Sequence, residues 1–236
     1  MARALFLLLV AAPLAVMTPA SAQAVGGIQI APVMVTMTGE HNIASLRLRN
    51  GRDRPVSFEI DSYAWTQNNG QDVLTPTQDL IVAPGVFEIP AGGEQIVRLG
   101  VTVPAAREER AYRIVMRELP SPLPGGNVLG FTLEMSLPVF VTPVGARPIL
   151  ETRTVQNGPA PALAISNTGS AHTQILALSD SDAGILAAPH YLLAGASAVI
   201  PLPPFSHSVR LSATAANGAQ LDRVIHVEQP RGAHPG

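Results

Sequence analysis

Six histidines are the first residues of this chain with side chains suited to chemistry: His41, His172, His190, His207, His226 and His234. Metal sites bring such ligands together at short, regular spacings, and these six are scattered without one. Ser206-His207-Ser208 has the residue types of a nucleophile and a base, but no Gly-x-Ser-x-Gly turn accompanies it. Neighbouring residues of a strand point to opposite faces, so His207 is poorly placed to serve either serine. We expect no metal site, and a hydrolase only if an activity screen reveals one.

Two acidic motifs are not expected to form a metal or catalytic site. Asp180–Gly184 (DSDAG) resembles the start of a calcium loop, but its twelfth position is Tyr191 instead of the glutamate that such a loop needs. The run Arg107–Arg110 (REER) is interpreted as a solvated charged turn. The chain has no glycine-rich phosphate loop and no cysteine, which excludes thiolate and disulfide chemistry. The sequence predicts a protein that is not an enzyme and needs no cofactor or small-molecule substrate.

Composition narrows the choice of partner and compartment. The 236 residues carry a formal net charge of only −2, which predicts neither a nucleic-acid surface nor a membrane-binding patch. Residues 1–22 have one arginine, an apolar run over Ala4–Val16 and small residues before Gln23, the layout of a secretory signal peptide. An uncleaved membrane anchor is the alternative, although the apolar run is short for a membrane span. We expect export to the periplasm and a mature protein beginning near Gln23.

The elements that must position any site are strands, because nearly every segment alternates apolar and polar residues. Such segments are Ile28–Met37, Ala44–Asn50, Pro55–Trp65, Glu94–Val103 and Ala111–Leu119, and turn pairs such as Asn50-Gly51 and Asn69-Gly70 separate them. Strands in this number over about 120 residues are typical of an immunoglobulin-like β-sandwich.

A change in composition after Val141 predicts a second domain. Residues 143–148 contain two prolines and a glycine, which suits a hinge. Beyond it the strands are shorter and richer in alanine. We therefore predict an all-β protein with a first sandwich over 23–142, a hinge over 143–148, a smaller sandwich over 149–230 and a disordered tail over 231–236.

One long segment has no obvious place in a single sandwich. Val128–Pro143 (VLGFTLEMSLPVFVTP) carries apolar residues at every second position from Leu129 to Val141, and Pro138 interrupts the opposite face. Proline within a strand usually marks an edge, and an apolar edge invites unwanted pairing. Either the strand bends at Pro138 and buries both halves in its own core, or Leu129, Phe131 and Leu133 fill the incomplete core of a partner.

Taken together, four segments resemble a known family. RNGRDRPVSFEIDSYAW, DLIVAPGVFEIPAGGEQIVRLG, EERAYRIVMRELP and NVLGFTLEMSLPVFVTP resemble, in order and spacing, the periplasmic pilus-assembly chaperones of the chaperone–usher pathway, the PapD-like group. The SLPVFV ending is most similar to the archaic branch, which serves spore-coat-U-like subunits. The resemblance covers nearly all of the first domain, whereas the second matches only in position and β-character.

The resemblance implies two sandwiches in an L arrangement and a chaperone that completes a pilin-like subunit having an incomplete immunoglobulin fold. It assigns subunit binding to Leu129, Phe131 and Leu133, with Met135 as a fourth residue. The loop over 121–127 would meet an outer-membrane usher. We keep one alternative function, an exported adhesion or structural module that self-associates through the same edge.

The chain departs from the family at the carboxylate anchor. Family members grip the carboxyl terminus of their subunit with two basic residues, and Met34 and Pro138 occupy those positions here. If a carboxylate anchor exists, arginine must supply it, because the chain has no lysine, and guanidinium suits bidentate carboxylate binding. Arg98, Arg113 and Arg117 are the candidates on predicted strands. For each of them the alternative is a pair with a nearby acid or exposure to solvent.

Overall fold

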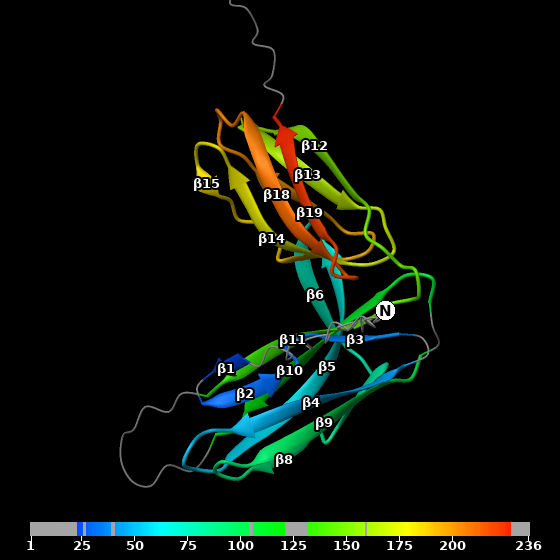
Figure 1. Cartoon of the computed structure of the whole chain (residues 1–236), viewed down its shortest axis with the longest axis vertical. Coiled ribbons are helices and arrows are strands. Elements are labelled where there is room, and N and C mark those ends of the chain that lie inside the picture. The colour runs from blue at the N-terminus through cyan, green and yellow to red at the C-terminus, as the bar shows by residue number, and fades with distance from the viewer. Residues whose placement is uncertain are drawn as a thin grey trace, which may run out of the picture.

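The computed structural model describes residues 23–25, 27–38, 41–103, 106–120, 132–158 and 160–227. Within these ranges every regular element is a β-strand, and the strands form two sandwiches (Figure 1). The strands of the two sandwiches run in crossed directions, which sets the sandwiches at an angle (Figure 1). The predicted fold, two immunoglobulin-like sandwiches, is confirmed. No helix in the described ranges is long and apolar enough to cross a membrane.

The first sandwich is built from β1–β11. One sheet has the order β1-β2-β4-β9-β7, from β1 (Gln23–Val25), β2 (Ile28–Ala31), β4 (Ile43–Asn50), β9 (Glu94–Val101) and β7 (Leu80–Ala83). The facing sheet has the order β3-β11-β10-β5-β6, with β8 also paired to β5. Its strands are β3 (Val35–Met37), β11 (Glu134–Val141), β10 (Arg110–Glu118), β5 (Val56–Asn68), β6 (Gln71–Pro76) and β8 (Val86–Ile89).

Apolar side chains that alternate along the strands with exposed residues are buried between the two sheets and stabilise this sandwich. In β4, Leu46 and Leu48 are fully buried while the arginines between and after them face outward. Phe58, Ile114 and Met116 from the facing sheet are also fully buried, and burial of each such side chain contributes about 1.5–3 kcal/mol.

The segment Ile28–Met37, expected as one strand, is in fact two. β2 belongs to the first sheet and β3 to the facing sheet, and residues 32–34 lie between them. Pro32 has no N–H to continue the ladder, so the chain leaves one sheet there and joins the other. This switch leaves β3 only three residues long.

The second sandwich is smaller. Its first sheet has the order β12-β13-β17, from β12 (Leu150–Asn157), β13 (Ala160–Asn167) and β17 (Ser197–Pro201). The other has the order β15-β14-β18-β19, with β16 also paired to β14. Its strands are β14 (Thr173–Asp180), β15 (Gly184–Ile185), β16 (Tyr191–Leu192), β18 (Ser208–Ala215) and β19 (Gln220–His226). Asp180, the start of the calcium-like motif, accepts hydrogen bonds from Ser206 and from the backbone N–H of Asp182 and Ala183, so it closes a local turn.

A buried asparagine closes one turn in each sandwich. Asn50 donates its side-chain N–H groups to the carbonyls of Arg54, Ile89 and Pro90 and accepts from the Arg52 N–H. Asn167 makes the corresponding set in the second sandwich, donating to Ala171 and Leu192 and accepting from Ile149 and Gly169. Because such buried amides are costly when unpaired, full pairing fixes both turns.

The β5–β6 hairpin reaches from the first sandwich to the second (Figure 1). At its tip Gly70, with a φ of 76°, packs so closely on β17 that an added Cβ would lie 2.8 Å from the Cβ of Ala198. Gln67 donates to the carbonyl of Tyr191 and accepts from the N–H of Leu193. Two side chains of the first sandwich, Trp65 and Phe140, belong to the hydrophobic core of the second.

Candidate functional site

The outer edge of β11 is paired over only part of its length. On one side β10 pairs with all eight residues, Glu134–Val141. On the other side the short β3 pairs only with Val139–Val141. In the described part of the chain, Glu134–Pro138 therefore has no strand on that side. Unpaired backbone N–H and C=O groups along such an edge can accept another strand.

An apolar groove runs beside this open half-edge. Its cavity has a volume of about 290 Å³. One side is formed by Ile30 of β2 and by Val33, and the other by Leu133, which precedes β11, and by Met135 and Leu137 of β11. Leu133 and Met135 are half-buried against the core, and Leu137 is buried. The edge and the groove together offer both backbone pairing and an apolar surface.

The four predicted subunit-binding residues are thus divided. Leu133 and Met135 line the groove, on the same side of β11 as the core residues Leu137 and Val139. Leu129 and Phe131 lie outside the described residues, as do three other predicted segments: the signal peptide over 1–22, the usher-binding loop over 121–127 and the tail over 231–236. The described strand begins at Glu134.

Arg117 lies on the opposite face of β10 from the core and has acidic neighbours. Its Nη1 is 2.5 Å from Asp61 Oδ2, and its Nε is 3.0 Å from Glu134 Oε2. Hydrogen bonds from Arg117 to Tyr63 and Asp61 raise the pKa of the guanidinium. An incoming carboxylate would have to compete with two acids already in place.

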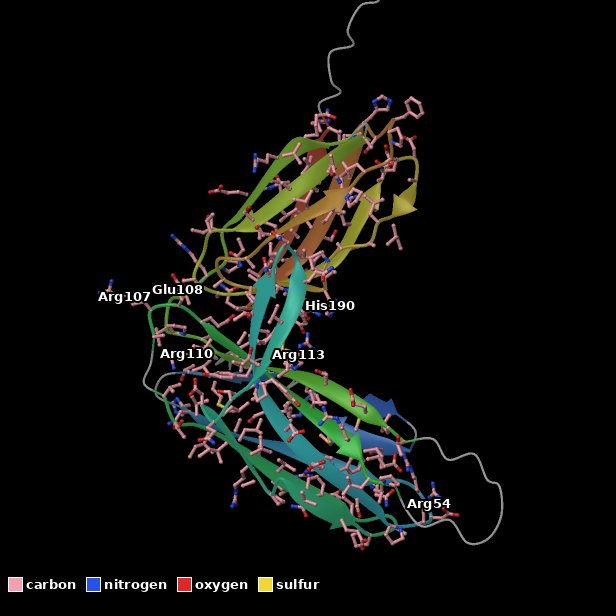
Figure 2. The ribbon with its side chains drawn as sticks, turned by 180° about the vertical axis from the view of Figure 1, so that it is seen from behind. Arg54, Arg107, Glu108, Arg110, Arg113 and His190 are labelled. Atoms are coloured by element: carbon pink, nitrogen blue, oxygen red, sulfur yellow. The ribbon has the colours of Figure 1, made fainter. Side chains whose placement is uncertain are left out.

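Arg113 lies between the two sandwiches (Figure 2). Its guanidinium carbon is 4.0 Å from the centre of the Trp65 ring, and Nη2 is 3.5 Å from Asp72 Oδ2. Burial lowers the pKa of Arg113, which is opposed by the charge of Asp72. In the described structure the Arg113 Nε and the Trp65 Nε1 are both buried without a hydrogen-bond partner. Two adjacent unpaired donors suit an acceptor group.

The structure does not bring Arg98 to the other two arginines. Arg98 is on β9, in the sheet facing that of Arg113 and Arg117, and pairs across the strands with Ser45 and Ala83. Its side chain is exposed on the outer face of that sheet. Of the three candidates, only Arg113 and Arg117 are on β10, the strand that pairs with β11 and its open edge.

Met34 and Pro138 stand where the family's basic residues are expected. The hydroxyl of Tyr191 from the second sandwich lies 3.9 Å from the Met34 Sδ. Pro138 is buried and pairs across the strands with Arg113. A cation is therefore present beside the Pro138 position, on the neighbouring strand.

The interpretation of Arg107–Arg110 as a solvated turn is wrong for Glu109. Its side chain is 1% exposed and its Oε1 is 2.7 Å from His172 Nδ1. The same oxygen accepts from the His172 N–H, and Oε2 accepts from the Thr142 hydroxyl at 2.6 Å. Glu109 can be buried because His172 of the second sandwich and Thr142, which follows β11, supply these contacts. The residues next to Glu109 in the sequence give no indication of either partner.

The sequence interpretation also missed the aromatic contact between the sandwiches. Phe140 stacks on the His172 ring with centroids 3.6 Å apart, and Trp65 meets the Tyr191 ring edge-on at 5.4 Å. The alternation in β11 contained a signal, since Phe140 is a large apolar residue on the face opposite the core residues. Nothing in the local sequence marked His172.

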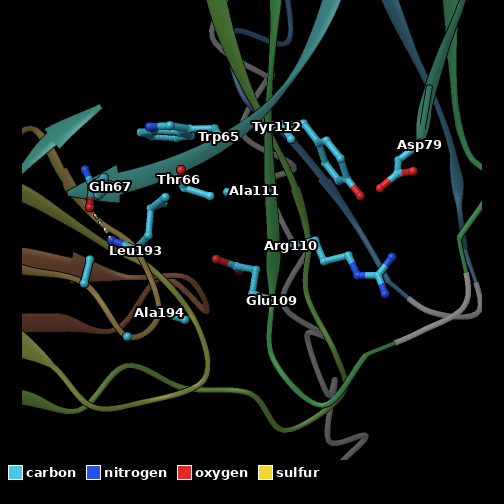
Figure 3. Close-up of a pocket in the computed structure, with 13 residues that line it drawn as sticks. Trp65, Thr66, Gln67, Asp79, Glu109, Arg110, Ala111, Tyr112, Leu193 and Ala194 are labelled. Carbon is cyan, nitrogen blue, oxygen red and sulfur yellow. Dashed lines mark hydrogen bonds between the residues drawn. The ribbon is translucent and has the colours of Figure 1, made fainter. Parts of the chain in front are cut away.

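A cleft of about 390 Å³ also lies between the sandwiches, lined by Trp65, Gln67, Glu109, Arg110, Tyr112 and Leu193 among others (Figure 3). Its acids, Asp79 and Glu109, come from the first sandwich. No group of three or more histidine or acidic side chains in the described residues is arranged to hold a metal ion. The cleft offers mixed charge and no catalytic pairing that we recognise.

Comparison with known proteins decides the family. Residues 27–147, just over half of the chain, match the family of Pili and flagellar-assembly chaperone, PapD N-terminal domain. This chain belongs to that family. It is a family of assembly chaperones, not of enzymes, and its members work in the periplasm. No curated protein matches the chain at a significant level.

Solved structures of pilus chaperones share the fold. In the CsuC–CsuE chaperone–tip adhesion subunit pre-assembly complex from archaic chaperone–usher Csu pili of Acinetobacter baumannii, the matched chain is 18% identical, with a TM-score of 0.69. The match covers 86% of this chain and 99% of that one. The Salmonella enterica SafA pilin complex with the SafB chaperone gives 13% identity, a TM-score of 0.68 and coverage of 87% and 98%. The E. coli chaperone DraB gives 14% identity, a TM-score of 0.64 and coverage of 85% and 98%.

Proposed function

We propose that this chain is a periplasmic chaperone that holds a pilin-like subunit with an incomplete immunoglobulin fold and delivers it to an outer-membrane usher. The observation that carries the proposal is the half-paired edge of β11, Glu134–Pro138, beside the groove lined by Leu133 and Met135. Membership of a pilus-chaperone family supports it. Residues 1–22 would direct export, and the loop over 121–127 would meet the usher.

The mechanism is donor-strand complementation. A subunit strand would pair with the open edge of β11, and alternate apolar side chains of this chain would fill the subunit's groove. Leu129 and Phe131 have the same parity as Leu133 and Met135, so they would extend the same row. Burial of each side chain is worth about 1.5–3 kcal/mol, which is sufficient to hold a subunit without ATP or another cofactor.

Arg113 is our candidate for the anchor of the subunit's carboxyl terminus. It lies between the sandwiches, opposite Pro138, and its side chain is 17% exposed, so part of it is accessible to a terminal carboxylate. A guanidinium fork matches a carboxylate, and the stacking of Arg113 on Trp65 holds the fork in place. Arg117 is the weaker candidate because Asp61 and Glu134 already occupy its donors.

Co-purification with the subunit encoded nearest to the chain's own gene tests the proposal. Phe131→Asp should abolish the complex while the chaperone stays folded, because a carboxylate cannot enter an apolar groove without a large desolvation cost. Phe205→Asp, at a position 82% exposed in the second sandwich, is the matched control and should bind normally. Normal binding by Phe131→Asp, or a stable homodimer that ignores the subunit, would overturn the donor-strand proposal.

A further inference from the structure

A partly buried ion pair lies at the start of β11, away from the cleft between the sandwiches. Arg52, in the turn after β4, places Nη1 2.5 Å from Glu118 Oε1 and Nη2 2.9 Å from Oε2. The two side chains are only 17% and 9% exposed. Such a two-pronged, shielded pair is stronger and more directional than an exposed one.

The Glu118 carboxylate also holds the chain where it enters β11. Its Oε2 accepts from the backbone N–H of Leu133 at 3.2 Å, while the Glu118 N–H donates to the Leu133 carbonyl at 2.8 Å. Leu133 is the residue before β11, and its side chain lines the apolar groove. One carboxylate thus joins the turn after β4, the end of β10 and the start of the open half-edge.

The other end of the pair is fixed as firmly. The Arg52 N–H donates to the side-chain oxygen of Asn50, which is itself fully buried. The stem of Arg52 passes so close to Gly27 that an added Cβ there would lie 2.9 Å from the Arg52 Cγ. Arg52 is therefore held at its backbone N–H by Asn50, and its aliphatic side chain packs beside Gly27.

We propose that Arg52 and Glu118 are positioning residues that fix the backbone of Leu133 and thereby the register in which the open half of β11 meets its subunit. This inference rests on the proposed function. A strand whose side-chain period is two loses its entire apolar face if its register slips by one residue. A fixed Leu133 backbone keeps the side chains of Leu133 and Met135 on one face of β11, where the subunit is expected to meet them.

The first test uses the free protein and needs no subunit. Glu118→Ala and Arg52→Ala should each raise the hydrogen-exchange rate of the Leu133 amide about tenfold to a hundredfold, while amides of β5 keep their protection. Arg52→Lys keeps the charge but loses the fork, and should fall between. The double variant should exchange no faster than Glu118→Ala alone, because that change already removes both the Arg52 pair and the bond to Leu133. Glu94→Gln is the control, since its pair with Arg47 is exposed and 3.9 Å long.

The second test measures affinity for the subunit encoded nearest to the chain's own gene. Glu118→Ala should weaken binding at least tenfold, and Glu94→Gln should not. An unchanged Leu133 exchange rate would overturn the positioning role whatever the subunit does. Faster exchange with unchanged affinity would show that the pair does not govern binding. If the unaltered chain fails to bind any pilin-like subunit, the proposed function fails, and the register role falls with it.

Discussion

Arg113 of β10 and Pro138 of β11 are direct cross-strand partners, and the Arg113 guanidinium turns over the indole of Trp65 at 4.0 Å. The uncharged Pro138 thus lies beside the positively charged Arg113. The pair places a cation beside the Pro138 position, carried by the adjacent strand and stacked on an aromatic ring. The proposed anchor of the subunit's carboxyl terminus can therefore be tested at one residue.

Replacing Arg113 should weaken subunit binding without unfolding the chaperone. Arg113→Gln removes a charged donor, and loss of a charge-assisted hydrogen bond costs about 1.5–3 kcal/mol, a drop of roughly tenfold to a hundredfold in affinity. Arg98→Gln, an exposed arginine on the other sheet, is the control. Titration of both variants with the subunit compares them; equal affinities would remove Arg113 as the anchor.

Phe140 should stabilise the whole molecule from its position between the sandwiches. It is fully buried and stacks on His172, so Phe140→Ala leaves a cavity that neither sandwich can fill alone, at a cost of about 3–5 kcal/mol. Urea denaturation measures the effect. The same change at Phe205, which is 82% exposed, should alter the unfolding free energy very little; a similar loss at both positions would contradict this assignment.

The approach of the β5–β6 hairpin to β17 can be tested with two glycines. Gly70 and Gly92 both have positive φ, 76° and 68°, so alanine carries similar backbone strain at either. An added Cβ meets Ala198 only at Gly70. Gly70→Ala should therefore destabilise by about 1–3 kcal/mol more than Gly92→Ala. Thermal unfolding of the two variants gives the difference, and no difference would mean that the tip does not press on β17.

Glu118 should make the unfolding free energy of the protein fall at acid pH. The hydrogen bonds from Arg52 lower the pKa of Glu118 in the folded state below that of the unfolded chain, which is about 4.3. Its stabilisation is therefore fully present above that value and is lost as pH falls through the lowered folded-state pKa. Urea midpoints at pH 7 and pH 3 should differ less for Glu118→Gln than for the unaltered chain. An equal fall of the urea midpoint between pH 7 and pH 3 in both proteins would contradict this role of Glu118.

Period-two patterns were enough to predict the fold because several strands of the first sandwich, such as β2, β4 and β9, bury one face and expose the other. Phe58 and Ile60, or Leu46 and Leu48, report their burial within a few residues of sequence. The strand switch at Pro32 was missed because alternation continues through it, although the two halves join different sheets.

The site was only partly predictable, since its properties depend on contacts between distant segments. The apolar parity of Leu133 and Met135 predicted an apolar face for binding a subunit, which stays a prediction. The groove of this chain that they line with Ile30 and Val33 was not predicted. The burial of Glu109 required His172, a partner 63 residues away that no local pattern connects to it. The two acids that occupy Arg117 come from β5 and β11, so the order of arginines in the sequence ranked it no lower than Arg113.

The reach of the β5–β6 hairpin has a consequence for how such chains diversify. The segment between β11 and β12, which we predict to be a hinge over 143–148, connects the two sandwiches along the chain. Gln67 and Gly70 make a second contact between the sandwiches, far upstream of that segment. Joining the second sandwich of another chain at this segment would separate the Tyr191 and Leu193 backbone from the hairpin that contacts it. We therefore expect the two sandwiches and the hairpin to be exchangeable only together.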